Sequence, residues 1–439
     1  MKPRSLLVAV VLLAVLSVVV WWANKHPQSS SENTATTKIV DIPSDQVQQI
    51  TVKKKGGVPL VLNRENGKWH ITQPANFPAD QDSIASLTAA LSPLSADSVV
   101  EDKSVDAAKY GLTSPSMTVT VGLKNGKSDT IEFGDDAPAG SLVYVARSSD
   151  PKIYAVTSST KSTFDKTVND LRDKRLLTFN SDKLTGVELD SKKGPIFFAK
   201  NNQGDWQITK PAPYRADSFQ VEDLVRKLQD AKMDLSGTAD DQKKDATLFA
   251  AGQPVATVKV TDANGAQTME VKKNKTDYYA KSSAVTGIYK VSSDLGSALD
   301  KNLDDFRNHK LFDFGFSDPT KVEFGNGTSD SVYEKSGQDW KQNGKTLDAA
   351  TVQAVIDNLR DLSATSFPTA GFANPTISVT VVSNGGKRTE KVSFAKSKNT
   401  YIAKRDDGSA LYEVQEKNVD DMVKAFGDIK PASGKEKKK

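Results

Sequence analysis

The sequence predicts an α+β protein with three tandem homologous units, each a mostly antiparallel sheet with two helices, after one N-terminal transmembrane helix. The first observation is that Trp69, Trp206 and Trp340 recur at intervals of 137 and 134 residues, each inside a similar local sequence. The second is that strand-like alternating segments and tight-turn signals surround each tryptophan in the same order. The third is a long uncharged stretch near the N-terminus. Self-similarity at a fixed period indicates a repeated structural unit.

The uncharged stretch covers residues 5–23 and follows Lys2 and Arg4. As a helix it spans about 28 Å, enough to cross the hydrocarbon core of a bilayer. Trp21 and Trp22 lie at its far edge, where indole rings favour the membrane interface. A cleaved signal peptide is the alternative, but its apolar region is usually shorter and ends in a small-x-small site. We expect an uncleaved single-pass anchor in a bacterial inner membrane, with the N-terminus cytoplasmic and the bulk periplasmic.

The composition excludes several classes of function. The chain has no cysteine, so it forms no disulfide, holds no catalytic thiol and carries no lipid on a lipobox cysteine. Of its net charge of +4, Lys2 and Arg4 supply +2 and the tail Lys435–Lys439 supplies +3, so the remaining body has a net charge of about −1. A nucleic-acid-binding surface would show a concentrated basic patch. We therefore expect no nucleic-acid partner.

Within each repeat, the tryptophan strand is preceded by two short strands and followed by a helix. An aspartate marks the start of each helix, at Asp80, Asp217 and Asp348, where its carboxylate can accept the free amides of the first turn. Apolar residues then follow at helical spacing, so each helix should lie on a sheet. Later strands are joined by Asn-Gly pairs, which tolerate the positive φ of hairpin turns. These pairs are Asn125-Gly126, Asn264-Gly265 and Asn384-Gly385.

Each unit is therefore expected to run β-β-β-α-β-β-β-β-α, mostly antiparallel because its turns are short. The closing helices are expected between Phe164 and Leu171, between Leu299 and Phe306, and between Val419 and Phe426. The predicted segments are a transmembrane anchor (1–24), a flexible spacer (25–37), repeat units at 38–179, 180–315 and 316–430, and a disordered lysine-rich tail (431–439).

Sequence motifs for catalysis, cofactors and metals are missing. The chain has three isolated histidines and no phosphate-binding loop, dinucleotide fingerprint or nucleophile elbow. Carboxylate pairs such as Asp240-Asp241 and Asp304-Asp305 lie in polar stretches, whereas glycosidase chemistry needs two carboxylates that converge in a cleft. We therefore expect a protein that is not an enzyme, without catalytic residues, cofactor or metal.

The tryptophans allow two interpretations. An exposed indole face would suit a sugar ring, and a buried one would fill the space between a strand and the first helix. Recurrence in the same local sequence favours the buried position. Function should then be sought where the copies differ and where they meet.

Two basic segments join the predicted units. They contain Arg172, Lys174 and Arg175 at the first junction, and Arg307 and Lys310 at the second. These side chains either form salt bridges between units or contact an acidic partner. They are the candidate partner-contact residues, and their position at the junctions favours salt bridges.

The chain resembles a bacterial family known as domain of unknown function 4340. The resemblance rests on the N-terminal anchor, the Gly-x-Trp-x-Ile-Thr-x-Pro strand, the Ala-Asp helix start and the phrase Tyr110-Gly111-Leu112-Thr113-Ser114-Pro115. It implies a membrane-tethered envelope protein, whose genes often neighbour those for ABC-type export permeases. No catalytic residue comes with it.

These features favour a non-enzymatic periplasmic accessory or scaffold protein that binds an ABC-type exporter or another envelope component. The alternative is an envelope module that binds a glycan or a lipid. A hydrolase is the third hypothesis, and it requires a cleft with converging acidic or Ser/His groups.

Overall fold

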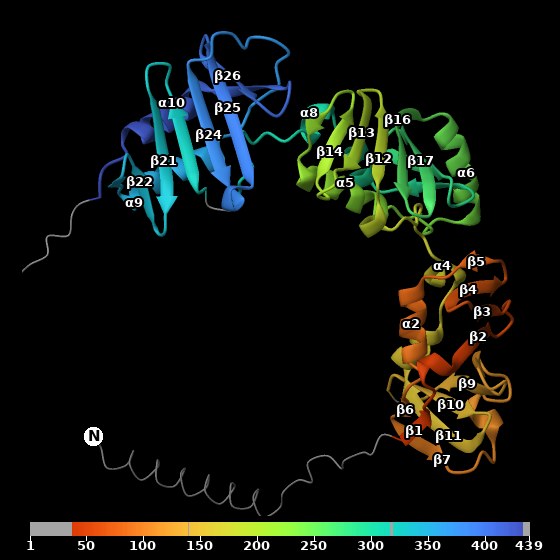
Figure 1. The fold of residues 1–439 in the computed structure, drawn as a ribbon. Helices are drawn as coiled ribbons and strands as arrows, with labels where there is room; N and C mark the ends of the chain where they lie inside the picture. Colours follow the sequence, from red (N-terminus) through yellow and green to blue (C-terminus); the bar gives the residue numbers. More distant parts are fainter. Residues whose placement is uncertain (1–36, 139, 317–318, 433–439) are drawn as a thin grey trace, which may run out of the picture. The chain divides into compact units, whose positions relative to one another are not determined.

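The computed structural model describes residues 37–138, 140–316 and 319–432 (Figure 1). The predicted anchor (1–24), the spacer up to residue 36 and residues 433–439 of the predicted tail lie outside these ranges. Within the described ranges, no helix has the length and apolar character needed to cross a membrane. The chain divides into two compact units, with the boundary between Lys174 and Arg175.

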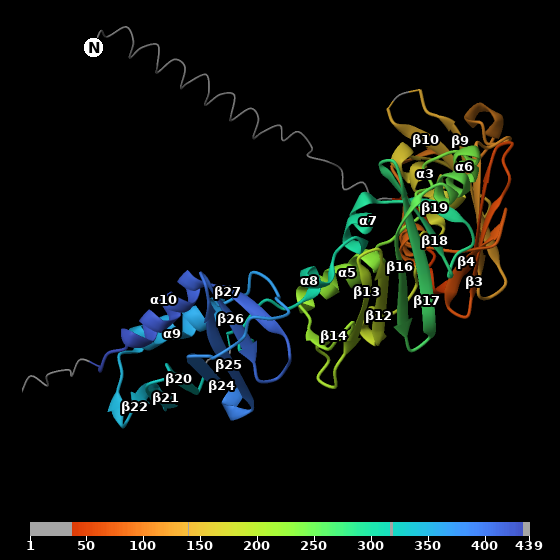
Figure 2. The ribbon, with the colours of Figure 1, turned by 90° about the horizontal axis from the view of Figure 1, so that it is seen from above.

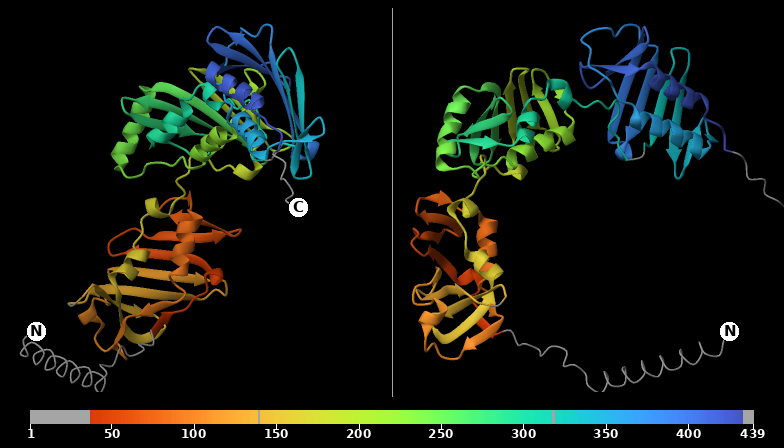
Figure 3. Two further views of the ribbon diagram at one scale, coloured as in Figure 1. Left: turned by 90° about the vertical axis from the view of Figure 1, so that its left-hand side faces the viewer. Right: turned by 180° about the vertical axis from the view of Figure 1, so that it is seen from behind.

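The first unit is built on a nine-stranded sheet with the order β5-β4-β3-β2-β8-β9-β10-β11-β7, beside a small β1-β6 sheet. Helix α2 lies across one face of the large sheet (Figure 3). The elements are β1 (Thr37–Val40), β2 (Val47–Lys54), β3 (Leu60–Glu65), β4 (Lys68–Gln73), β5 (Phe77–Pro78), α2 (Gln81–Ala89), β6 (Leu94–Ala96), β7 (Ser98–Glu101), β8 (Met117–Leu123), β9 (Ser128–Asp136), β10 (Leu142–Arg147), β11 (Asp150–Thr157), α3 (Ser158–Phe164) and α4 (Val168–Leu171).

The second unit contains two eight-stranded sheets, and the first of them has the order β15-β14-β13-β12-β16-β17-β18-β19. Its elements are β12 (Gly186–Ser191), β13 (Gly194–Lys200), β14 (Trp206–Lys210), β15 (Tyr214–Arg215), α5 (Ser218–Gln229), α6 (Ala239–Ala250), β16 (Gln253–Asp262), β17 (Gly265–Asn274), β18 (Asp277–Ser282), β19 (Ile288–Val291), α7 (Ser293–Leu299) and α8 (Leu303–Phe306).

The other sheet of the second unit has the order β23-β22-β21-β20-β24-β25-β26-β27. Helices α9 and α10 pack against each other on one of its faces (Figure 2). The elements are β20 (Lys321–Gly325), β21 (Asp330–Ser336), β22 (Asp339–Gln342), β23 (Lys345–Thr346), α9 (Ala349–Asp361), β24 (Ile377–Ser383), β25 (Arg388–Ser397), β26 (Thr400–Arg405), β27 (Leu411–Gln415) and α10 (Glu416–Gly427).

The predicted α+β class with antiparallel sheets is confirmed, because the strands of the three large sheets pair antiparallel throughout their described ladders. The three large sheets also share one strand order, apart from the additional β7 in the first. The Asn-Gly pairs lie in the tight connections between the central strands, with positive φ at Gly126, Gly265 and Gly385. Local turn chemistry therefore sets the hairpins.

The tryptophans are buried, as their recurrence predicts. Trp69, Trp206 and Trp340 are 6%, 5% and 7% exposed, and they lie on β4, β14 and β22, each separated from its first helix by a two-residue strand. Each belongs to a separate apolar cluster. The indoles are core residues and offer no exposed ring face for a sugar.

The predicted aspartate caps are confirmed, and each aspartate has a second role. The Asp80, Asp217 and Asp348 carboxylates accept backbone N–H groups of the first helical turn. Each aspartate's own backbone N–H donates, at 2.8 Å, to a carbonyl oxygen of the segment that closes its sheet domain. The three acceptors are Leu171 O, Phe306 O and Lys430 O. One residue therefore starts the helix and holds the returning chain.

The prediction of two helices for each sheet is wrong for the first two sheets. The expected closing helix is split into α3 and α4 in one case and into α7 and α8 in the other. Thr167 and Asn302 begin the second piece, each in a capping box with the aspartate three residues later. Such a cap restarts the helix with a new direction because it satisfies the free amides locally. The additional helix α6 likewise begins with a Thr238–Asp241 capping box.

Candidate functional site

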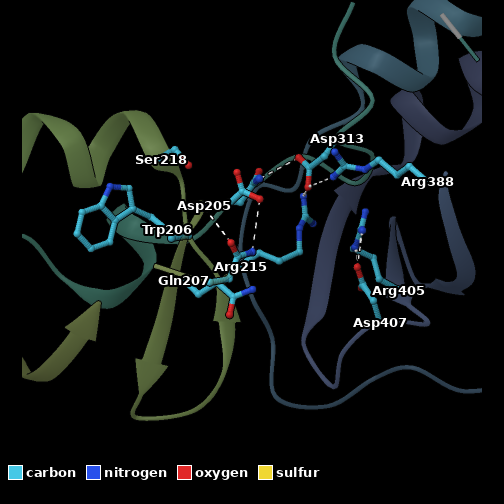
Figure 4. Close-up of a pocket in the computed structure, with 12 residues that line it drawn as sticks. Asp205, Trp206, Gln207, Arg215, Ser218, Asp313, Arg388, Arg405 and Asp407 are labelled. Atoms are coloured by element: carbon cyan, nitrogen blue, oxygen red, sulfur yellow. Dashed lines mark hydrogen bonds and ion pairs between the residues drawn. The ribbon is translucent and has the colours of Figure 1, made fainter. Parts of the chain in front are cut away.

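A polar pocket of about 330 Å³ lies within the second unit, between the β12–β19 sheet and the β20–β27 sheet (Figure 4). Strand β14 and the turn before it form one side, and the segment after α8 with strands β25 and β26 forms the other. Its lining residues are Asn201, Asp205, Trp206, Gln207, Arg215, Ala216, Ser218, Asn308, Asp313, Arg388, Arg405 and Asp407. Charged groups from two sheets therefore converge on one cavity.

Arg215 joins the two sides of the pocket. It ends the two-residue strand β15, and its Nη1 donates to Lys310 O at 2.8 Å and to the Tyr412 hydroxyl at 3.4 Å. Its Nη2 forms an ion pair with Asp313, and both side chains are about one fifth exposed. Because a guanidinium is planar and has several donors in fixed positions, it holds its partners in a more defined arrangement than a lysine ammonium does.

Asp313 is held by three further contacts. Its Oδ1 accepts a hydrogen bond from Asn308 Nδ2 at 2.9 Å, and its backbone N–H donates to Glu390 Oε1 at 2.8 Å. Arg388 lies 3.5 Å from its Oδ2. This aspartate is thus the centre of a network that includes residues from β15, the junction and β25.

Arg405 and Glu390 are the two most buried charges of the network. The Arg405 side chain is 4% exposed and donates to Glu390 Oε1 at 3.2 Å from both terminal nitrogens. It also binds Asp407 through Nε at 2.9 Å and Nη2 at 2.6 Å. Burial raises the pKa of the Asp407 carboxyl, but the hydrogen bonds and charge of Arg405 outweigh it and hold that pKa below the usual value. Burial opposes the charge on Arg405, yet Asp407 and Glu390 raise the pKa of its guanidinium.

The residue at the position of Arg405 makes an equivalent hydrogen bond in all three large sheets. Register places Arg147, Ser282 and Arg405 on matching strands, opposite Ile131, Met269 and Val392. Their side chains donate to the carbonyl oxygens of Ile39, Leu176 and Leu311, in the segment that leads into each sheet. The shared role is structural; Arg147 also pairs with Asp129, and in the third copy the aspartate bound by Arg405, Asp407, lines the pocket.

A second pocket of about 240 Å³ adjoins the first. The two share Gln207, Arg215, Arg405 and Asp407. The remaining lining of the second pocket is largely apolar or aromatic, and it comprises Ile208, Pro213, Tyr214, Gly408, Ala410 and Tyr412. We call the two pockets together the junction groove.

A family model for a domain of unknown function, DUF4340, matches residues 69–205 and 206–377, which together exceed two thirds of the chain. The chain belongs to the DUF4340 family. Each matched DUF4340 segment begins at a tryptophan of the repeat, Trp69 or Trp206, so the family's period coincides with the one seen in the sequence. No curated protein and no solved structure matches the chain.

The predicted junction residues of this DUF4340 protein have different positions. Arg172 stacks 4.2 Å from the ring centre of Phe77, within the first unit. Arg307, 7% exposed, lies 4.1 Å from the ring centre of Tyr214 and 3.6 Å from that of Phe367. Both follow the last short helix of their sheet domain. The two arginines are therefore packing residues, and Arg307 contacts one ring on β15 and one in the segment between α9 and β24.

The three remaining predicted contact residues are Lys174, Arg175 and Lys310. Lys174 is half-buried. The hydrogen bond from Thr167 is the main cause of the lowered pKa of the Asp170 carboxyl, and the charge of Lys174 lowers that pKa further. Arg175 is exposed, and its backbone pairs with Lys232. Lys310 is exposed, donates to Arg360 O at 3.1 Å and lies 3.9 Å from Asp361. None of the five predicted contact residues lines the junction groove, although Lys310 and Arg307 contact its lining residues Arg215 and Tyr214.

The groove residues Arg215, Asp313, Arg388, Arg405 and Asp407 were not among the sequence candidates. A signal was present for Arg215, because the copies differ at its position: Pro78 and Thr346 stand where Arg215 stands in the second sheet. The carboxylate pairs, in contrast, have local roles, since Asp241 and Asp305 complete capping boxes. In the described ranges, no group of three or more His, Cys, Asp or Glu residues is arranged to hold a metal.

Proposed function

We propose that the three large sheets are copies of one ancestral unit, and that the chain is a tandem array held at the inner membrane by residues 1–24. The shared strand order supports this proposal, as do the buried tryptophan on β4, β14 and β22 and the three aspartate caps. Equivalent backbone bridges at Ala79–Arg172, Ala216–Arg307 and Leu347–Pro431 close each copy in the same manner. Arrays of this kind present extended surfaces to a partner.

The function that this arrangement supports best is that of a non-enzymatic accessory protein of the bacterial envelope. Its partner would be an ABC-type exporter or another envelope protein. The single observation that carries the proposal is the repeated partly exposed surface on the central strands β8, β16 and β24. At equivalent register, Thr120, Lys259 and Thr380 lie between buried neighbours and therefore face away from the core.

Site-specific photocrosslinking in cells tests this role. A photoreactive residue is placed in the full-length chain at Thr120, Lys259 or Thr380. Matched controls carry it on the exposed side of the first helices, at Ala85, Glu222 or Ala354. We expect a sheet position to capture one membrane transporter subunit that the helix positions do not capture. Equal capture from both sets, or none from the three sheet positions, would contradict the proposal.

A further inference from the structure

The junction groove has two compartments with different chemistry and a common wall. The polar compartment, of about 330 Å³, carries Asp205, Arg388 and Asn201, and the smaller one, of about 240 Å³, carries Pro213 and Tyr214. Together the compartments have the size of a small-molecule site, for which about 300–1,000 Å³ is usual. The groove therefore fits an elongated ligand with one strongly polar end and a less polar neighbouring part.

The charges of the groove balance. Three arginines and three aspartates line it: Arg215, Arg388, Arg405, Asp205, Asp313 and Asp407. An anionic ligand would lie against the carboxylates, and a cationic ligand would lie against the guanidinium groups. In either case the ligand's charge would lie beside protein groups of the same sign, with little water between them. Such contacts raise the free energy of the complex in a partly buried site. The lining thus favours a ligand without net charge.

The polar side of the groove offers both donors and acceptors. Asp407, 55% exposed, and Asp205, which is exposed, present acceptor oxygens, while the exposed Gln207 amide offers both functions. Arg388 is 45% exposed, and its ion-pair distances to Asp313 and Glu390 are 3.5 and 3.4 Å, too long for strong hydrogen bonds. A hydroxyl group both donates and accepts, so a row of hydroxyls matches such a surface.

The smaller compartment supplies an apolar wall. Pro213, Tyr214 and Ala410 line it, and Tyr214 is held in place by Arg307 at 4.1 Å from its ring centre. Tyrosine combines an apolar ring body with a polar hydroxyl, which suits a ligand that is wet at its edges and apolar on its faces. A pyranose ring has this character. A lipid chain fits less well, because it would lie against the charged walls that the two compartments share.

We propose that the junction groove binds a neutral oligosaccharide, with one sugar ring in each compartment. The hydroxyls of the first ring contact Asp205, Arg388 and Asp407, and Gln207 contacts both rings from the shared wall. The second ring lies against Tyr214. The saccharide function is additional to partner binding at the sheet surfaces, and neither depends on the other.

Isothermal titration of the full-length protein in lipid nanodiscs tests the proposal. Nanodiscs avoid detergents with sugar headgroups, which would compete for the groove. The probes are the neutral disaccharides maltose, cellobiose and N,N′-diacetylchitobiose, with inorganic phosphate and glutamate as charged comparisons. We expect at least one disaccharide to bind with one-to-one stoichiometry, and phosphate and glutamate not to bind. Absence of binding by all three disaccharides overturns the proposal, as does a preference for either anion.

Two variants place the binding in the groove. Gln207→Ala and Arg388→Ala should each weaken disaccharide binding at least tenfold. Thr209→Ala is the matched control, because Thr209 lies two residues along the same strand on the same side and lines neither pocket. It should bind within twofold of the parent. Thermal melts confirm that each variant is folded, and unchanged binding by folded Gln207→Ala and Arg388→Ala overturns the proposal.

Discussion

A buried arginine holds the entry to the third sheet. Arg405 donates to Glu390 and to the carbonyl of Leu311, so it joins strand β26 to β25 and to the segment before β20. Glu390 is 2% exposed, and its Oε2 makes no hydrogen bond within the described ranges. Such a carboxylate depends for its charge compensation mainly on Arg405, with the more exposed Arg388 3.4 Å from its Oε2.

Replacing that arginine should be costly. We expect Arg405→Met to lower the free energy of unfolding of the second unit by about 3–5 kcal/mol, because Glu390 is left buried without its main partner. Urea denaturation followed by circular dichroism measures this loss. The double variant Arg405→Met/Glu390→Met should recover part of it, since no unpaired charge is then buried. The control Arg388→Met, at a 45% exposed side chain, should cost at most about 1 kcal/mol. If Arg405→Met and Arg388→Met lowered the free energy of unfolding by similar amounts, Arg405 would not have the special role that its burial implies.

The stacked arginine of the second junction gives a different prediction. Arg307 lies over Tyr214 and Phe367, and a planar guanidinium stacks on rings in a way that an ammonium does not. We expect Arg307→Lys to destabilise the second unit by about 1–2 kcal/mol, the range of a partly desolvated cation–π contact. The same change at the exposed Arg175 should have no measurable effect. If Arg307→Lys left the free energy of unfolding unchanged, the positive charge alone would be sufficient for stability at this position.

At the scale of elements, the aspartate caps couple helix starts to closing segments. Asp217 accepts the Gln220 N–H at 3.2 Å through its carboxylate, and its own N–H donates to Phe306 O. The side-chain bond is the part that mutation can remove. We expect Asp217→Ala to cost about 1 kcal/mol, with Asp217→Asn close to the parent, in thermal unfolding followed at 222 nm. A loss for Asn equal to that for Ala would point to charge instead of capping.

A second carboxylate fixes the approach to the second sheet. Asp262 accepts the backbone N–H groups of Asn180 and Asn264, both at 2.8 Å, and these bonds lower the pKa of its carboxyl. A lowered folded-state pKa contributes stability above the unfolded-state pKa of about 3.9, and the contribution is lost as pH falls through the folded-state pKa. We expect Asp262→Asn to be less stable than the parent at neutral pH, with the difference shrinking in acid. A difference that is independent of pH would contradict this.

Much of each element could be predicted from sequence because its causes are local. Asparagine and glycine set the hairpins, aspartate starts the helices, and alternation identifies the strands. The splits at Thr167 and Asn302 were missed because apolar spacing runs on across them while a capping box interrupts the backbone. The short edge strands β5, β15 and β23 contain only two residues each, too few for a periodic signal.

The site was less predictable than the fold. Arg215 and Asp313 are 98 residues apart, and their ion pair exists because two sheets approach each other in the second unit. The basic residues of the junctions were conspicuous in the sequence, yet Arg172 and Arg307 stack on aromatic rings. A comparison of the three copies identifies the positions at which they differ. Arg215 is one of these, because no arginine stands at its position in the other two sheets.

At the scale of the whole molecule, the boundary at Lys174–Arg175 separates two compact units. Each unit has its own apolar clusters, and the second contains the junction groove. We expect fragments 37–174 and 175–432 to unfold cooperatively when expressed separately, each at the temperature of its transition in the full-length chain. Calorimetry measures this. Failure of either fragment to give a cooperative transition would show that the units stabilise each other.

The central claim is that recurrent residues hold the fold while residues that differ between copies are available for binding. Trp206 and Gln207 are neighbours on β14, with the indole 5% exposed and the amide exposed in the groove. The most direct test compares the free energies of unfolding of Trp206→Ala and Gln207→Ala. We predict a loss of about 3–5 kcal/mol for the tryptophan variant and less than about 0.5 kcal/mol for the glutamine variant. Equal losses, or a neutral Trp206→Ala, would contradict the account.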